Sequence, residues 1–331
     1  MQEKYKKIFM KQVIGIGNAL VDALYRVDND HILQELELPK GSMQLINTER
    51  YHAICRRMAE TDQERATGGS ACNTILALAE LGAETGLIGK VADDDNGRFF
   101  TEAFERSGAK TYIAGSQLPT GVASTFITPD GQRTFGTYLG AAAELTADDV
   151  RPEWLEGYSY LYIEGYLVQN HELIERTVDM AHEAGLMVCL DMASYNIVEE
   201  ERDFFAQLLQ KTDIVFANEQ EARAFTGKAP REALAELAGI CSIAVVKTGA
   251  DGAMAQTGGN VTEVPALPVK KVVDTTAAGD FFAAGFLYAH AAGKPLHSCL
   301  ATGTILATEV IQIVGTKLDE TTWERIRTLV G

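Results

Sequence analysis

The chain has 331 residues, with 46% hydrophobic and 23% charged residues, a composition typical of a folded globular protein. That length fits one large α/β domain or two small domains, and the composition excludes a fibrous, collagenous or disordered protein. The 29 basic and 46 acidic residues leave a net charge of −17. We therefore expect no nucleic acid as a partner, because binding to a phosphate backbone needs a basic surface.

The cysteines and the apolar runs of the sequence indicate in which cellular compartment the protein is found. The five cysteines are scattered and form no Cys-x-x-Cys pair, which is typical of a reducing environment and argues against a structural zinc site. No apolar run reaches the length of a membrane span, and no apolar core of a secretory signal follows the N-terminus. We predict a cytoplasmic protein that makes no membrane contact, with a flexible leader over residues 1–10.

Predicted strands and helices alternate along most of the chain. Short runs rich in Val and Ile predict strands, and longer apolar or amphipathic runs that stop at glycine predict helices. In chain order we expect strands over 12–17, 84–89, 160–164, 187–191, 214–217 and 243–248, and helices over 73–81, 99–107, 173–184, 204–210 and 219–225. This alternation predicts an α/β fold, a three-layer sandwich around a mostly parallel sheet.

Two stretches, about 19–50 and about 110–140, interrupt the alternation. They contain turn signals such as Pro39-Lys40-Gly41 and Pro129-Asp130-Gly131 between short alternating runs. We predict that they form a small β-sheet inserted in a single domain over 11–331. Such a sheet would stand where a lid over a ligand is found.

A turn of small residues leads directly into an apolar helix near the end of the chain. It reads Asp-Thr-Thr-Ala-Ala-Gly-Asp over residues 274–280 and continues with Phe281 and Phe282. The first N–H groups of a helix have no partner within the helix, so the turn fits an anion site. A simple cap at Asp280 explains the same residues, and both alternatives stay open at this point.

The segment 274–280 resembles a signature of the ribokinase-like (PfkB) family of carbohydrate and nucleoside kinases. Four further motifs of that family precede this segment, in the order usual for the family: Gly17-Asn18 with Asp22, Gly68-Gly69-Ser70 with Asn73, Asn218 with Glu221, and Lys247-Thr248-Gly249 with Gly252. The resemblance implies a ribokinase-like fold. It also implies a kinase that uses ATP and Mg2+ to phosphorylate the primary hydroxyl of a ribose-type sugar or nucleoside. The motifs are most similar to those of adenosine kinases and their bacterial sugar-kinase relatives.

The resemblance also implies a role for each matching residue. Asp280 would be the catalytic base, Arg133 would reach the phosphates from the lid, and the anion hole would be Ala277, Ala278 and Gly279. Acceptor contacts would come from Asn18, Asp22, Gly69, Ser70, Asn73 and Glu164. Nucleotide contacts would come from Asn218, Thr248, Gly249, Gly252 and Gly303, and the residues that order Mg2+ would be Asn218 and Glu221.

Structural roles compete with several of these assignments. They are an Asx-turn at Asp22, a helix cap at Asn73, a surface arginine at Arg133, a solvated strand end at Glu164, and a capping box at Asn218 and Glu221. Glycine is usual in the family at the position of Ala277. If that position has a positive φ, alanine costs about 1–2 kcal/mol there.

Two other functions stay open. The run Gly15-Ile16-Gly17-Asn18-Ala19-Leu20 nearly matches a dinucleotide fingerprint, with Leu20 at the third glycine, which would suit an NAD-dependent oxidoreductase. Ala277 would suit a non-catalytic sugar or nucleotide binder of the same fold. Also open are a monovalent cation as a further cofactor, and a monomer or a homodimer formed through the lid.

Overall fold

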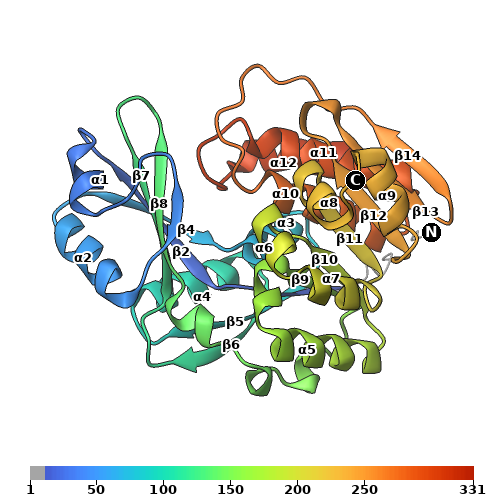
Figure 1. The fold of residues 1–331 in the computed structure, drawn as a ribbon, viewed down its shortest axis with the longest axis horizontal. Helices are drawn as coiled ribbons and strands as arrows, with labels where there is room; N and C mark the ends of the chain where they lie inside the picture. Colours follow the sequence, from blue (N-terminus) through green and yellow to red (C-terminus); the bar gives the residue numbers. More distant parts are fainter. Residues whose placement is uncertain (1–11) are drawn as a thin grey trace, which may run out of the picture.

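The computed structural model describes residues 12–331, so the leader predicted over residues 1–10 lies outside the described part. Within that part, a nine-stranded sheet has the strand order β14-β13-β12-β11-β10-β9-β1-β5-β6, and a five-stranded sheet has the order β3-β8-β7-β2-β4. Figure 1 shows the small sheet standing to one side of the helix-covered large sheet. The predicted fold class, with a large mostly parallel sheet and a second small sheet, is confirmed.

Parallel strands make up most of the large sheet. They are β1 (Val13–Ile16), β5 (Thr85–Ala92), β6 (Lys110–Ser116), β9 (Tyr160–Glu164), β10 (Met187–Asp191), β11 (Ile214–Asn218) and β12 (Ile243–Lys247). A hairpin of β13 (Ala253–Thr257) and β14 (Asn260–Val264) continues the sheet with antiparallel pairing. The central strands are nearly continuous apolar runs because helices cover both of their faces.

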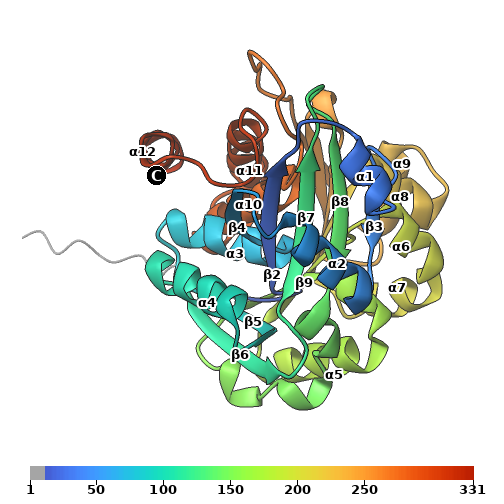
Figure 2. The ribbon, with the colours of Figure 1, turned by 90° about the vertical axis from the view of Figure 1, so that its left-hand side faces the viewer.

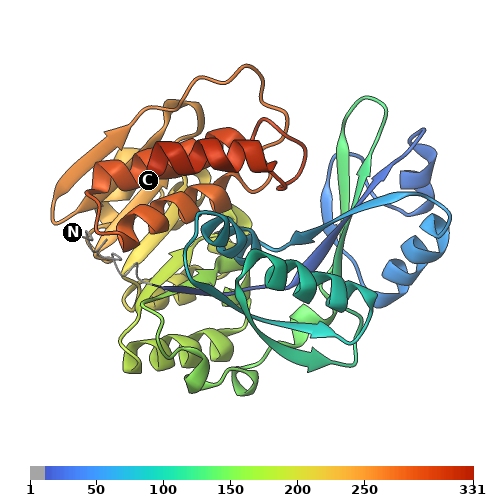
Figure 3. The same ribbon diagram turned by 180° about the vertical axis from the view of Figure 1, so that it is seen from behind.

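Two groups of helices bury these faces. One face packs against α3 (Ser70–Glu80), α4 (Asp95–Ser107), α10 (Ala278–Ala291), α11 (Leu296–Val310) and α12 (Glu320–Val330). The other face packs against α5 (His171–Glu183), α6 (Tyr195–Glu200), α7 (Arg202–Leu209), α8 (Glu219–Thr226) and α9 (Pro230–Leu237). Figure 3 shows α10 and α11 packed side by side on the first face.

The small sheet and the predicted lid differ by two strands: the sheet contains one strand outside the predicted stretches and lacks one inside them. It contains β2 (Leu20–Arg26), β3 (Met43–Leu45), β4 (Gln63–Gly68), β7 (Gly121–Ile127) and β8 (Arg133–Tyr138), with α1 (His31–Glu35) and α2 (Thr48–Met58) packed on one face (Figure 2). β4 lies outside both predicted stretches, because its polar sequence carries no alternating apolar signal. β6 lies inside the second stretch but belongs to the large sheet, where it pairs in parallel with β5 after the crossover through α4.

Candidate active site

Four neighbouring strands of the large sheet end on polar residues. These are Glu164 on β9, Asp191 on β10, Asn218 on β11 and Lys247 on β12, with Asp191 opposite Glu164 and Lys247 opposite Asn218 in the strand register. The carboxyl ends of parallel strands meet at one edge, where open α/β sheets bind their ligands. The start of α10 lies at this edge, since a methyl group placed on Gly279 would be 3.0 Å from Lys247 Nζ.

Asp280 is the central carboxyl group of the site. Ser70 Oγ donates a hydrogen bond to its Oδ1 at 2.7 Å, and Asn73 Nδ2 donates one to its Oδ2 at 2.8 Å. Burial raises the pKa of Asp280 to about 7, and the charge of Asp191 adds to the rise, while the two hydrogen bonds and Lys247 oppose it. A carboxyl group with such a pKa can exchange a proton near neutral pH.

Free backbone donors surround this carboxyl group. Ala277 has φ +61°, in the left-handed region, and caps the helix that begins at Ala278. The N–H groups of Ala277, Gly279 and Asp280 make no hydrogen bond within the part of the chain that the structure describes, whereas the N–H of Ala278 donates to Thr275 O at 3.2 Å. A left-handed residue followed by a helical one turns successive N–H groups into a concave anion site. We call Ala277, Gly279 and Asp280 the nest, and Ala278 of the predicted anion hole is not a free donor.

Arg133 joins the small sheet to the segment before the nest. Its NH1 donates to Asp274 Oδ2 at 2.5 Å, and Asp274 also accepts hydrogen bonds from Thr276 N at 3.0 Å and Gly315 N at 2.9 Å. Burial alone would raise the pKa of Asp274, but these N–H groups and the charge of Arg133 lower it overall. Arg133 is therefore an ion-paired residue, 17% exposed, that links the small sheet to the segment before α10, and the surface-arginine alternative is wrong.

Asp22 and Asn73 have no capping role. Asp22 lies inside β2 and Asn73 lies inside α3, whose N-cap is Gly69, so the Asx-turn and helix-cap alternatives are wrong. Burial raises the pKa of Asp22 to about 7, and the charge of Asp280 adds to the rise while Arg133 opposes it. The pKa of Asp22 therefore depends on the charge of Asp280 on α10 and on that of Arg133 on the small sheet.

Glu164 and Asn18 contact each other instead of solvent. Asn18 Nδ2 donates to Glu164 Oε1 at 2.5 Å, and Ala71 N donates to Glu164 Oε2 at 3.0 Å. Glu164 is only 2% exposed, so the solvated strand-end alternative is wrong. Gly69 has φ +101°, and a methyl group there would lie 2.1 Å from Asn18 O. Glu164 thus anchors the start of α3, which carries Ser70 and Asn73.

Asn218 and Glu221 form the capping box that the sequence suggested. Asn218 N donates to Glu221 Oε2 at 2.7 Å, and Glu221 N donates to Asn218 Oδ1 at 2.9 Å. Burial raises the pKa of Glu221 to about 7, although the charge of Lys247 opposes the rise. Among residues 12–331, no cluster of three or more His, Cys, Asp or Glu could hold a metal ion. A metal here would therefore depend on water or a ligand's phosphates for most of its coordination, which is typical of Mg2+.

The predicted nucleotide-contacting glycines differ in their surroundings. Gly252 has φ +106° and a methyl group there would lie 2.0 Å from Val264 O, while one on Gly303 would lie 2.7 Å from Phe282 O. Close backbone packing therefore explains Gly252 and Gly303. Gly249 is exposed with no atom near its missing side chain, and Thr248 N donates to Gly252 O at 2.8 Å to close the turn. Only Gly249 of these three glycines is open to a ligand on its side-chain face.

Sequence reasoning gave no role to Asp191, Lys247, Tyr166 or Tyr195. Asp191 is the last residue of a predicted strand and Lys247 the second-last of another, so the rule that ligands bind at carboxyl ends would have found them. Tyr166 lies in η4 (Gly165–Gln169) directly after β9, and Tyr195 begins α6, which contacts η4. Their side chains are 37% and 44% exposed, which is high for aromatic rings.

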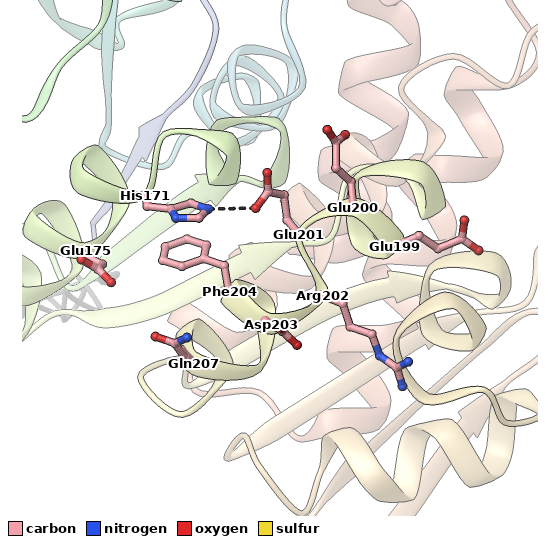
Figure 4. Close-up of a pocket in the computed structure, with 9 residues that line it drawn as sticks. All are labelled: His171, Glu175, Glu199, Glu200, Glu201, Arg202, Asp203, Phe204 and Gln207. Carbon is pink, nitrogen blue, oxygen red and sulfur yellow. Dashed lines mark hydrogen bonds and ion pairs between the residues drawn. The ribbon is translucent and has the colours of Figure 1, made fainter.

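Two hollows lie away from the nest. One of about 390 Å³, drawn in Figure 4, is lined by His171, Glu175, Glu199, Glu200, Glu201, Arg202, Asp203, Phe204 and Gln207, and His171 Nε2 lies 2.8 Å from Glu201 Oε2. None of the predicted site residues lines it. The other, of about 330 Å³, reaches the site only through Asn73 and Phe281.

A family model identifies the chain. The model of the pfkB family carbohydrate kinases matches residues 42–323. The chain belongs to the PfkB family. Members of this family are kinases, so the protein is a phosphotransferase that acts on a hydroxyl group of a small-molecule sugar or nucleoside, and the family implies ATP and typically Mg2+. The oxidoreductase alternative is therefore wrong.

Solved structures and curated proteins agree with this family. A probable sugar kinase from Rhizobium etli CFN 42 has a TM-score of 0.86 and 34% identity, covering 97% of this chain and 98% of that one. An adenosine kinase from Sinorhizobium meliloti has a TM-score of 0.85 and 34% identity, covering 97% and 99%. An uncharacterized sugar kinase from Archaeoglobus fulgidus is 28% identical over 253 residues, which is 73% of this chain and 97% of that one.

No helix among the described residues of this PfkB kinase is long and apolar enough to cross a membrane.

The backbone of Ala277 allows a direct test of the nest. Because its φ is +61°, Ala277→Gly should remove steric strain and raise the free energy of unfolding by about 1 kcal/mol, measured by urea titration. Ala278→Gly, at a helical φ, should lower it by up to about 1 kcal/mol. A lower urea midpoint for Ala277→Gly would contradict the left-handed conformation.

Proposed function

We propose that this PfkB kinase transfers the γ-phosphoryl group of ATP to the primary hydroxyl of a ribose-type nucleoside or sugar, with adenosine as the first candidate. The observation that carries the proposal is the position of Asp280, a carboxyl group with a pKa of about 7 that belongs to the nest. Ser70 and Asn73 fix its two oxygens, so that its orientation does not depend on the ligand.

Asp280 would act as the catalytic base. Its carboxylate accepts the hydroxyl proton as the acceptor oxygen attacks, and the free N–H groups of the nest stabilise the charge on the phosphoryl oxygens. ATP supplies the phosphoryl group, and Mg2+ neutralises part of its charge. Asn218 and Glu221 would order the water around Mg2+, and Thr248 and Gly249 would contact the nucleotide.

The small sheet would act as the lid of this site. Asp22 on β2 and Arg133 on β8 both belong to the small sheet, yet both interact with charges of the large domain. Closure by such a lid would exclude water and so suppress hydrolysis of ATP. We propose that Arg133 then exchanges Asp274 for phosphate. The homodimer through this lid and the monovalent cation remain predictions.

The acceptor would lie between Asp22 and Asp280. Asp22, Asn73 and Asn18 offer acceptors and donors for a pair of ribose hydroxyls. The exposed rings of Tyr166 and Tyr195 beside the strand ends favour an acceptor with a flat ring, hence a nucleoside over a free sugar. The likeness to an adenosine kinase structure over nearly the whole chain supports the same choice.

An acceptor screen with a base variant tests the reaction. We expect ATP turnover with adenosine in a coupled assay that also contains ribose, fructose and inosine in separate runs. Asp280→Asn should lower kcat at least about 100-fold, because the proton acceptor is lost. Turnover only with a phosphorylated sugar would overturn the acceptor class. Binding of adenosine and ATP without any turnover would contradict the proposed reaction.

The exposed tyrosines provide a test of nucleoside preference. Tyr166→Ala should raise KM for adenosine about tenfold, because stacking on a base is lost, and should leave KM for ribose within about twofold. Tyr166→Phe keeps the ring and serves as the matched control. Equal changes for both acceptors would contradict a role for Tyr166 in binding the base.

The raised pKa of Asp280 predicts how activity depends on pH. Since protonation removes the base, kcat/KM should fall as the pH drops below about 7. Ser70→Ala removes a hydrogen bond that favours the carboxylate, so the acid limb should move to higher pH. The exposed Ser242→Ala is the control, and an acid limb near pH 4 in the wild type would contradict the assignment.

The same pKa predicts how stability depends on pH. The folded protein binds a proton at Asp280 more tightly than the unfolded chain does, so this group's contribution to stability is lost as the pH rises from about 4 to about 7. Asp280→Asn should therefore raise the thermal midpoint at pH 8 more than at pH 5. A larger rise of the thermal midpoint at pH 5 than at pH 8 would show that folding does not raise the pKa of Asp280.

A further inference from the structure

Lys247 places a cation among the carboxylates of the sheet edge. Its Nζ lies 3.1 Å from Asp191 Oδ2, and the two side chains are 16% and 8% exposed. Burial works against the charged ammonium, but Asp191, Glu221 and Asp280 together hold the pKa of Lys247 above its ordinary value. Lys247 therefore stays protonated at neutral pH, and its charge points into the site.

The strand faces direct Lys247 toward the nest. Val245, two residues before Lys247 on the same face of β12, packs in the core that contains α10. Cys189 and Phe216 precede Asp191 and Asn218 by the same two residues and pack in the same core. Lys247 and Asp191 therefore share the α10 side of the sheet, whereas the side chain of Asn218 turns to cap α8.

The distance to α10 is short enough for Lys247 to act at the nest. A methyl group on Gly279 would lie 3.0 Å from Lys247 Nζ, tighter than most such contacts, so alanine at 279 would push the ammonium aside by a few tenths of an ångström. A second cation, Arg133, faces the site from the small sheet and is ion-paired with Asp274. Asp274 accepts two backbone hydrogen bonds in addition, which makes it a well-fixed partner for Arg133.

We propose that Lys247 is a catalytic residue, whose ammonium binds the oxygens of the phosphoryl group held in the nest, with Asp191 as its positioning partner. This inference rests on the proposed roles of Asp280 and the nest. Gly279 would then be required for the approach of Lys247 as well as for its N–H group. A chain with a net charge of −17 would in this way supply a local positive charge to a polyanionic substrate.

Lys247 keeps its proton throughout the transfer. Asp280 takes the proton of the acceptor hydroxyl while a bond forms between that oxygen and the γ-phosphorus. The bond between the γ-phosphorus and the bridging oxygen breaks, and its electron pair leaves on ADP. Lys247 donates hydrogen bonds to the phosphoryl oxygens before and after the transfer, and binds them most strongly when their charge is greatest.

Four variants test this role in the full-length protein. Lys247→Gln removes the ammonium, Lys247→Arg keeps a charge, and the double variant Lys247→Gln with Asp191→Asn removes both charges so that no unpaired carboxylate is left buried. Lys211→Gln is the control, because Lys211 is also ion-paired, with Asp179 at 2.6 Å, but at an exposed position. The readouts are kcat and KM for both substrates and the thermal midpoint of each variant.

A catalytic role predicts a specific pattern. Lys247→Gln should lower kcat about 100- to 1,000-fold, the size seen when one donor to a developing charge is removed, with KM for the acceptor within about threefold. The double variant should recover the wild-type thermal midpoint but stay as slow as Lys247→Gln. Lys247→Arg should be at least tenfold faster than Lys247→Gln, and Lys211→Gln should match the wild type.

Recovery of the wild-type rate in the double variant would overturn the proposal, because Lys247 would then only neutralise Asp191. A rate for Lys247→Gln within threefold of the wild type would overturn it too. If Lys247→Gln fails to fold, the double variant decides. A wild type that phosphorylates no acceptor would contradict the proposed function, whereas an active wild type with an active Lys247→Gln contradicts only this inference.

Discussion

The site depends on the meeting of two polar ends, the carboxyl edge of four parallel strands and the amino end of α10. Neither end alone carries all the charged side chains and N–H donors of the site. The strand ends carry Asp191 and Lys247 on one side of the sheet, and α10 brings to them Asp280 and N–H groups that have no partner among residues 12–331. Parallel strands and an apolar helix on the same face make this meeting possible, so the fold and the chemistry share one cause.

Buried charge is the second constraint on this edge. Burial raises the pKa values of Asp22, Glu221 and Asp280 to about 7, so each of these groups resists ionisation. Lys247 and Arg133 offset part of this cost through ion pairs with Asp191 and Asp274. Groups arranged in this way favour a ligand that brings its own charge and counter-ion, as a nucleotide with Mg2+ does.

The sequence predicted the parallel layers well because buried strands such as 160–164 and 187–191 are continuous apolar runs with clear ends. It misplaced β4, whose residues are polar, and β6, whose turn-rich neighbourhood concealed a crossover. The order of the family motifs predicted that Asp22, Asn73 and Asp280 belong to one site. In the structure Asn73 donates a hydrogen bond to Asp280, and the charge of Asp280 helps to raise the pKa of Asp22. The pairing of Lys247 with Asp191 could not be predicted from spacing, because 56 residues separate them along the chain.

The connections between the sheets determine how the small sheet can turn. Leu20 pairs with both Gly68 and Gly121, and Tyr138 pairs with Val122, so four crossings of the chain lie together at one end of the small sheet. Arg133 pairs with Ile127 at the other end. Six residues of extended strand make a lever arm of about 20 Å. A turn of about 10° at the crossings would move Arg133 by about 3.5 Å and Asp22 much less. Such a hinge would release the phosphate side of the site first and keep the acceptor side assembled.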